Sequence, residues 1–463
     1  MIATTLKSKK LSLLFLIAIT LATMIRFDRP LVRGDGVAYL AWVDSLALDH
    51  DFDLENQAER LSPVNTYAVI LNWHNGKYGN AFPFGVAFLQ YPFYRIGHIF
   101  LTHNWLNLNP DYFHAMQGVE LPYSFWVMVG ANLMTLCAVI LVWLTIQRFC
   151  HIWLAALLSW AVFIGSPLFY YTTVSPLNSH NPGAFSAAWL FYLAIQVIGS
   201  FDKIPRQKGT GTHTLHWIEI GVSAGLMTLS RWQLLLVAVP LWGLFAWYKQ
   251  WKGLSYATAA AAITLLPLPL IWNYLFDSPF IIPYDILSQE PFFRFPINSG
   301  NVFLHTLYHS PILILSLVGL AKLWKRNHIW ATALALIILF QVLINGAALD
   351  WWGGETYGMR RMSELYFVYA LLGAVALGHL SPTQGAERTT AIILRVALIV
   401  LILYNFLYIF SFFSYTWTSL EQTGIPTPKI MISYFLRQST RWEVIAAIFR
   451  THLGPPAWSM PGP

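Results

Sequence analysis

Charge is scarce in this chain. Only 11% of its 463 residues are Asp, Glu, Lys or Arg, whereas 56% are hydrophobic, and the mean hydropathy is +0.53. An ordinary soluble domain carries about 25% charged residues, so the composition excludes a string of soluble domains and indicates a polytopic membrane protein. Cysteine is almost absent. Cys137 and Cys150 alone exclude a disulfide framework and a cysteine-based metal cluster.

The sequence also lacks an internal repeat and a polar segment long enough to fold as a soluble catalytic domain. It is rich in apolar runs and in aromatic residues, which make up 16% of the chain with 21 Trp and suit many membrane interfaces. A span needs about 20 apolar residues. We therefore predict an all-α membrane helix bundle of about eleven spans, at residues 11–27, 122–147, 152–172, 183–201, 217–230, 232–248, 254–275, 304–321, 329–348, 363–380 and 391–413.

The distribution of charge orients these spans. Lys7, Lys9 and Lys10 precede the first apolar run, which we interpret as an uncleaved signal anchor with its N-terminus in the cytoplasm. Eleven crossings then leave 14 basic and three acidic residues inside, against 14 basic and 18 acidic residues outside. The net charge of +7 thus divides into +11 inside and −4 outside, which is a topology signal and not a nucleic-acid signal. We predict a multi-pass protein of the inner (plasma) membrane.

The spans and their connections form one predicted domain, residues 1–413. Its first outer loop, residues 28–120, is far longer than a linker needs to be, and loops of that length are usually functional. Within it, residues 37–48 and 82–101 are apolar but interrupted by polar residues and proline, which indicates juxtamembrane helices at the membrane surface. Residues 414–463 are predicted to be a tail on the outer face.

The first polar cluster on the outer side follows the first span. Asp35 lies between Gly34 and Gly36, which leave its carboxylate uncrowded and let the backbone turn sharply. Such an aspartate is suited to act as a general base or a metal ligand, and the alternative is the cap of the following helix. The acidic run further along does not fit a calcium loop, because Leu54 and Arg60 replace the required Gly and Glu.

Two further clusters fall on the same side. His180 lies in SPLNSHNPG, where it is placed to donate to a phosphate or a sugar, although a lone loop histidine is usually structural. Arg231 interrupts the apolar stretch GLMTLSRWQLLL. An ionisable residue at such depth is by default a functional candidate, and the alternative is a side chain that extends to the interface.

The densest cluster is DWWGGETYGMRR, residues 350–361. Arg360 and Arg361 carry forked donors that match phosphate oxygens. Arginine and tryptophan are also common interface anchors, so it is the density of polar groups that marks this loop. The candidates here are Asp350, Trp351, Glu355, Arg360 and Arg361.

In their order along the chain and in their common position on the outer side, these motifs resemble the GT-C class of integral-membrane glycosyltransferases. The resemblance rests on Asp35 early in a long first outer loop, on KYGNAFPFGVAFLQYPFYRIGH at residues 77–98, and on GLMTLSRWQ. SPLFYYTTVSPLNSHNPGAF and DWWGGETYGMRR look like a bacterial subgroup near the protein mannosyltransferase and lipid A aminoarabinose transferase families.

The resemblance implies transfer of a sugar from a polyprenyl-phosphate donor to the hydroxyl of a glycan, lipid or protein on the outer (periplasmic) face, with inversion and without a cofactor. Membrane lipids would be the other partners, and no nucleic acid is expected. It implies Asp35 as the base. Arg231, Arg360 and Arg361 would bind the donor phosphate, and His180, Glu355, Asp350 and Trp351 would orient the substrates.

The chain departs from these families at two points. Protein mannosyltransferases carry an Asp-Glu pair in the first loop, but Asp35 is followed by Gly36, so a second carboxylate must come from elsewhere. Glu120, just before the second span, is the candidate. No Asp-x-Asp sequence near Asp35 resembles the metal signature of oligosaccharyltransferases, which favours metal-independent chemistry.

Two other functions remain open at this stage, a lipid-linked sugar flippase or transporter and an outer-face polysaccharide polymerase or ligase. A transporter is expected to place its polar groups near the bilayer midplane. The polar clusters here fall on the outer side instead, which favours an enzyme. The polymerases and ligases usually have their large loop later in the chain.

Overall fold

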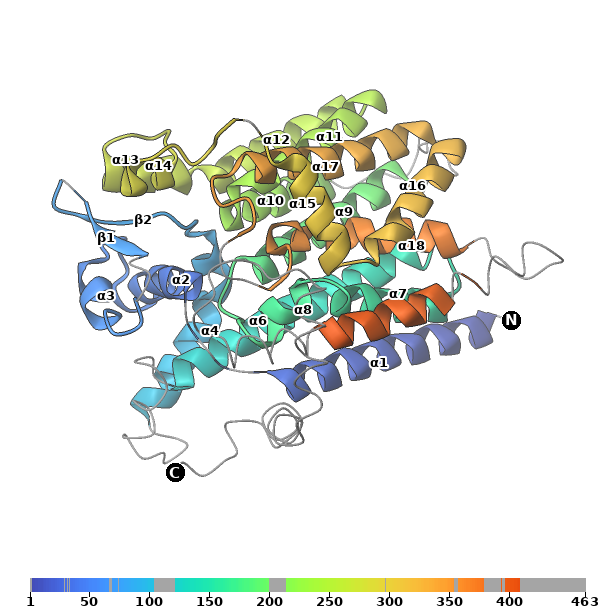
Figure 1. The fold of residues 1–463 in the computed structure, drawn as a ribbon, viewed down its shortest axis with the longest axis horizontal. Coiled ribbons are helices and arrows are strands. Elements are labelled where there is room, and N and C mark those ends of the chain that lie inside the picture. Colours follow the sequence, from blue (N-terminus) through green and yellow to red (C-terminus); the bar gives the residue numbers. More distant parts are fainter. Residues whose placement is uncertain are drawn as a thin grey trace.

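The computed structural model describes residues 2–28, 30, 32, 34–65, 69–73, 75–103, 121–199, 214–295, 297–353, 357–378, 393 and 396–408. It is a bundle of helices, as predicted, with one small two-stranded sheet (Figure 1). The predicted site residues Glu120 and Glu355 and the predicted tail at 414–463 lie outside the described residues.

Five helical stretches of the described chain are long and apolar enough to cross a membrane, or six if one bent pair counts as a span. The prediction of eleven spans therefore stays a prediction. The five stretches are in α1 (Ile2–Phe27), α6 (Leu121–Ile146), α9 (His180–Ile198), α12 (Trp251–Leu265) with α13 (Pro267–Phe276), and α17 (His328–Ala347).

Two predicted spans are interrupted. Residues 152–172 divide into α7 (Ile152–Ile164) and α8 (Leu168–Thr173), and residues 304–321 divide into α15 (Ser299–His309) and α16 (Leu313–Arg326), which meet at 111°. Each break contains a proline, Pro167 or Pro311. A proline lacks the backbone donor that an uninterrupted helix needs, which accounts for both breaks.

The remaining bundle helices are shorter. They are α10 (Thr214–Ser230), the 3₁₀ turn η2 (Trp232–Leu234), α11 (Leu235–Trp247), the 3₁₀ helix η3 (Arg360–Leu365), α18 (Tyr366–Gly378) and an apolar helix at Val396–Tyr408. Every residue of α18 from Tyr366 to Leu377 is buried. A helix that is apolar all round belongs in the core. α18 therefore lies in the core, and η3 directly precedes it in the chain.

The first loop forms helices where they are predicted. The segment 37–48 lies in α2 (Asp35–Asp44) and the π-helix η1 (Ser45–Asp49), and the segment 82–101 lies mostly in α4 (Gly85–Thr102). Their position at a membrane surface stays a prediction. Between them are α3 (Glu55–Arg60) and an unpredicted antiparallel hairpin of β1 (Ile70–Asn72) and β2 (Tyr78–Asn80).

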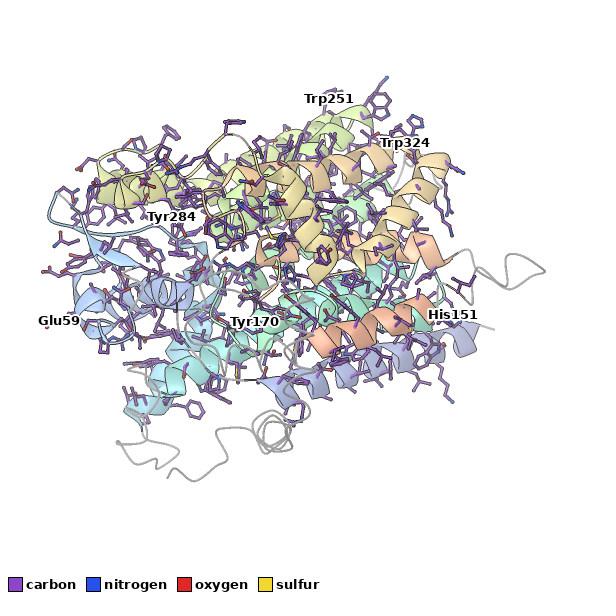
Figure 2. The ribbon with its side chains drawn as sticks, viewed as in Figure 1. Glu59, His151, Tyr170, Trp251, Tyr284 and Trp324 are labelled. Carbon is purple, nitrogen blue, oxygen red and sulfur yellow. The ribbon has the colours of Figure 1, made fainter. Side chains whose placement is uncertain are left out.

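The hairpin packs against the segment that follows α12. Asn75 Nδ2 donates to the carbonyl of Leu275 at 3.1 Å, and Lys77 Nζ donates to the carbonyl of Tyr274 at 2.6 Å. We call α2, α3, the hairpin, α13 and α14 (Pro283–Ser288) the end lobe. It lies at the end of the bundle away from the N-terminus (Figure 1). Glu59 marks this lobe, whereas His151 and Trp324 lie at the opposite end (Figure 2).

Candidate functional site

A cavity of about 360 Å³ lies where the end lobe meets the bundle. Its lining comes from α2, the start of α9, η2, α11, α13, α14, α17 and η3, so it joins segments more than 300 residues apart in sequence. Five predicted site residues line it together: Asp35, His180, Arg231, Arg360 and Arg361.

Asp35 reaches the cavity because of its two glycines. Gly34 has a φ of 56°, a left-handed conformation that favours glycine, and it caps α2 without a side-chain hydrogen bond. A Cβ on Gly36 would lie 2.9 Å from the carbonyl oxygen of Leu177, so only glycine lets α2 approach the SPLN turn this closely. Asp35 is the first residue of the helix and not its cap, and its carboxylate turns instead to Arg360.

Arg360 and Arg361 each hold one carboxylate. Arg360 Nη1 donates to Asp35 Oδ2 at 2.5 Å, and Arg361 Nη2 donates to Asp350 Oδ1 at 2.5 Å. The Asp35 side chain is 26% exposed and that of Asp350 is 36% exposed. Burial is the largest single influence and disfavours the charge of Arg360, but Asp35, Tyr171, Asp350 and Tyr284 together outweigh it and raise the pKa of the guanidinium above its ordinary value. Burial lowers the pKa of Arg361, but a guanidinium keeps its proton in proteins. Both arginines are therefore cations, with side chains 12% and 9% exposed.

The third arginine is held differently, by a carboxylate that the sequence reasoning missed. Arg231 Nη1 lies 3.0 Å from Glu364 Oε1, and His180 Nδ1 lies 2.6 Å from the same oxygen. The side chain of Glu364 is 1% exposed. The signal for it was present, because Glu364 falls inside the predicted span 363–380 and an ionisable residue within a span is rarely accidental.

The neighbours of His180 fix its charge. Its Nδ1 lies 2.6 Å from Glu364 Oε1, 2.9 Å from the Ser363 hydroxyl and 2.7 Å from Arg231 Nη1, which is also 3.2 Å from Nε2. A guanidinium only donates, so Arg231 needs a ring nitrogen that carries no proton. We assign His180 as a neutral imidazole between an anion and a cation.

The guanidinium of Arg231 is almost saturated. With its amide oxygen facing Arg231, Gln233 accepts from Nε at 3.1 Å and from Nη2 at 2.7 Å. Together with Glu364 and His180, these contacts occupy four of the five N–H donors of an arginine. Among the described residues, Arg360 and Arg361 each use one side-chain donor on a carboxylate.

The other predicted residues lie further out. Asp350 is not part of the lining and bonds the lining residue Arg361. Trp351 is not part of the lining and packs edge-on against His305, with ring centres 5.2 Å apart. Its predicted role in orienting a substrate therefore has no contact with the cavity to support it.

Aromatic and aliphatic side chains form the rest of the wall. Trp232 and Trp272 meet edge to face with ring centres 5.1 Å apart, and Tyr284 stacks on Phe292 at 4.6 Å. Tyr284, at the end lobe, is labelled in Figure 2. Burial raises the pKa of Tyr39, another lining residue, to about 12, so it stays a neutral hydroxyl. The cavity combines a cationic side with apolar walls, which is chemistry suited to an amphiphilic anion.

No family model matches the chain, and no curated protein matches it. Solved structures do. A structure of ArnT from Cupriavidus metallidurans bound to undecaprenyl phosphate has a TM-score of 0.52 at 10% identity, over 96% of this chain and 78% of that one. The oligosaccharyltransferase AglB from Archaeoglobus fulgidus, in complex with an inhibitory peptide and a dolichol-phosphate, has a TM-score of 0.54 at 13% identity, over 91% and 60%. Both are GT-C enzymes. This membrane protein therefore has the GT-C fold.

Proposed function

We propose that the protein is an integral-membrane glycosyltransferase. It takes a sugar from a polyprenyl-phosphate donor and transfers it to an acceptor hydroxyl on the outer face. One observation carries the proposal: Asp35, His180 and three arginines converge on one apolar-walled cavity. The fold supports it, because it is shared with structures bound to undecaprenyl phosphate and dolichol-phosphate.

The donor phosphate binds Arg360 and Arg361, whose remaining N–H donors are not used by the described residues. Their partner carboxylates are partly exposed and free to rotate away. Preorganised cations placed where charge develops stabilise the transition state, and the loss of one such donor typically costs 10²- to 10³-fold in rate. The Trp232 and Trp272 wall accommodates the first apolar part of the lipid.

The arrival of the phosphate also frees the base. Arg360 must share its positive charge between Asp35 and a phosphate bound to its other N–H donors, so phosphate binding weakens the ion pair and releases the Asp35 carboxylate. Asp35 then accepts the proton of the acceptor hydroxyl while the hydroxyl oxygen forms a bond to the anomeric carbon. The bond from that carbon to the phosphate oxygen breaks, and its electron pair leaves with the polyprenyl phosphate. Attack opposite the leaving group inverts the anomeric centre.

The purified protein in nanodiscs, incubated with polyprenyl-phosphate sugars and envelope lipid and glycan fractions, tests this function. We expect mass spectrometry to find free polyprenyl phosphate and a new, hydrolysis-stable glycoside. A matched sample without acceptor controls for spontaneous hydrolysis. Movement of the lipid-linked sugar across vesicles without a new linkage would instead establish a flippase.

The same proposal places the protein in the inner membrane with its N-terminus in the cytoplasm and the cavity outside. Single cysteines introduced into a chain without Cys137 and Cys150 test the orientation. We expect a thiol reagent that cannot cross membranes to label a cysteine at Glu59 in intact cells and one at Trp324 only after permeabilisation. The reverse pattern would invert the topology.

A further inference from the structure

Glu364 is buried but does not line the cavity. Its Cγ lies so close to Gly183 that a Cβ there would be 3.1 Å away, so the carboxylate has little room to rotate. Oε1 carries the contacts to Arg231 and His180, and Oε2 has no hydrogen-bond partner among the described residues. A buried charge is expensive unless it is paired, so this pair is expected to remain intact throughout a reaction cycle.

The three arginines therefore differ in the charge that they can offer. Asp35 and Asp350 can move away and leave Arg360 and Arg361 with a full positive charge each. Arg231 remains neutralised by Glu364, because that carboxylate is buried, with its side chain 1% exposed. With His180 neutral, the cavity offers two cations to an incoming ligand. A phosphate monoester carries about −1.5 to −2 at neutral pH.

We propose that Glu364 is a positioning residue that neutralises Arg231, so that the cationic charge of the cavity matches the polyprenyl phosphate product and allows it to leave. This inference rests on the proposed function. Arg231 remains a fixed hydrogen-bond donor in the wall, but it does not add a third positive charge. A third full charge would hold the leaving phosphate too tightly and slow the release of product.

Charge substitutions around Arg231 give a graded test. Glu364→Gln keeps the shape of the side chain and removes the opposing charge. In an effective dielectric of about 20, one unit charge several ångströms from a phosphate changes the binding constant by about tenfold or more. We expect Glu364→Gln to bind polyprenyl phosphate at least about tenfold more tightly, and to turn over more slowly at saturating donor. Destabilisation of the fold alone would not tighten binding.

Two further variants check the sign. Glu364→Asp keeps the charge and should leave the affinity within about threefold of the wild type. Gln233→Glu adds a second carboxylate against Arg231, at the cavity wall, and should weaken binding by about tenfold. This variant is less buried, so it also tests the proposal if Glu364→Gln does not fold.

A double-mutant cycle tests whether Glu364 acts through Arg231. In an Arg231→Gln background, the unpaired buried carboxylate of Glu364 takes up a proton and loses its charge, so Glu364→Gln should no longer tighten binding. Tyr366→Phe is a matched control two residues away, because its hydroxyl donates to the carbonyl of Ser159 at 2.7 Å in the core and does not face the cavity. It should leave affinity unchanged.

Binding is measured by titrating polyprenyl phosphate into the folded protein in nanodiscs and following tryptophan fluorescence, since Trp232 and Trp272 line the cavity. Product inhibition gives a second affinity. Equal or weaker binding by folded Glu364→Gln, or a tightening that persists without Arg231, would overturn this inference alone. A wild type that does not bind polyprenyl phosphate would overturn the proposed function as well.

Discussion

Two kinds of ion pair meet in the same cavity. Arg360 and Asp35 are joined by the shorter contact, 2.5 Å, yet Asp35 is 26% exposed, whereas Arg231 and Glu364 are 3.0 Å apart and Glu364 is 1% exposed. Distance alone would rank the first pair as the stronger. Exposure reverses the ranking, because water and an incoming anion can replace a partner at the surface but not one in the core. The Arg360–Asp35 pair can therefore exchange its carboxylate for an incoming phosphate, whereas the Arg231–Glu364 pair stays intact.

The largest expected effect comes from breaking the exchangeable pair on its catalytic side. Asp35→Asn keeps the shape of the side chain and removes the base, so we expect the transfer rate to fall by about 10³-fold, within the range for a lost general base. Polyprenyl phosphate should still bind, because Arg360 is free to receive it. Single-turnover kinetics with a labelled donor and the titration described above measure the two quantities. Undiminished transfer would remove Asp35 from the mechanism.

Breaking the same pair on its phosphate side should cost less. Arg360→Gln removes one of two cations that face the leaving group, and we expect kcat to fall by about 10²-fold together with weaker donor binding. Arg361→Lys is the graded comparison. It keeps the charge but loses the hydrogen bond from Nη2 to Asp350 and the guanidinium contact with Phe292, 5.4 Å from the ring centre. It should cost about tenfold. Unaltered donor kinetics in both variants would make these arginines interface anchors.

The sequence alone predicts some residues of this site and not others, and the difference depends on the surroundings of each residue. Asp35, His180, Arg231 and Arg360 were predicted because a polar residue in an apolar chain stands out. Glu364 was missed because it lies at the edge of the predicted span 363–380, where its charge was assigned to the outer side.

Trp232 and Trp272 were missed for the opposite reason. In a chain with 21 Trp, nothing local separates a cavity wall from an interface anchor. The pairings themselves, such as Arg360 with Asp35, join residues 325 positions apart and depend on tertiary packing. Pro167 and Pro311 indicate the two helix breaks, which apolar length alone does not reveal.

The permanence of the Arg231–Glu364 pair should appear in the stability of the folded protein more than in the transfer rate. Arg231→Gln leaves Glu364 buried without its cation, a change that typically costs 3–5 kcal/mol. Arg360→Gln leaves Asp35 partly exposed, so its cost should stay near the roughly 1 kcal/mol of an exposed pair. Thermal unfolding in the same nanodiscs compares the two. Similar losses of stability would mean that exposure does not separate the pairs.

Outside the ion pairs, the hairpin of β1 and β2 contacts α13, which contributes Trp272 to the cavity wall. Lys77 Nζ lies 4.2 Å from the ring centre of Tyr274 as well as bonding its carbonyl, and the contact is exposed. Exposed contacts of this kind contribute at most about 1 kcal/mol. Lys77→Ala should therefore change the donor KM by no more than about threefold and the melting temperature only slightly, with kcat unchanged. If KM instead rose tenfold at normal stability, the end lobe would bind the donor directly. The comparison between the exchangeable pair and the fixed pair would then have to include the hairpin.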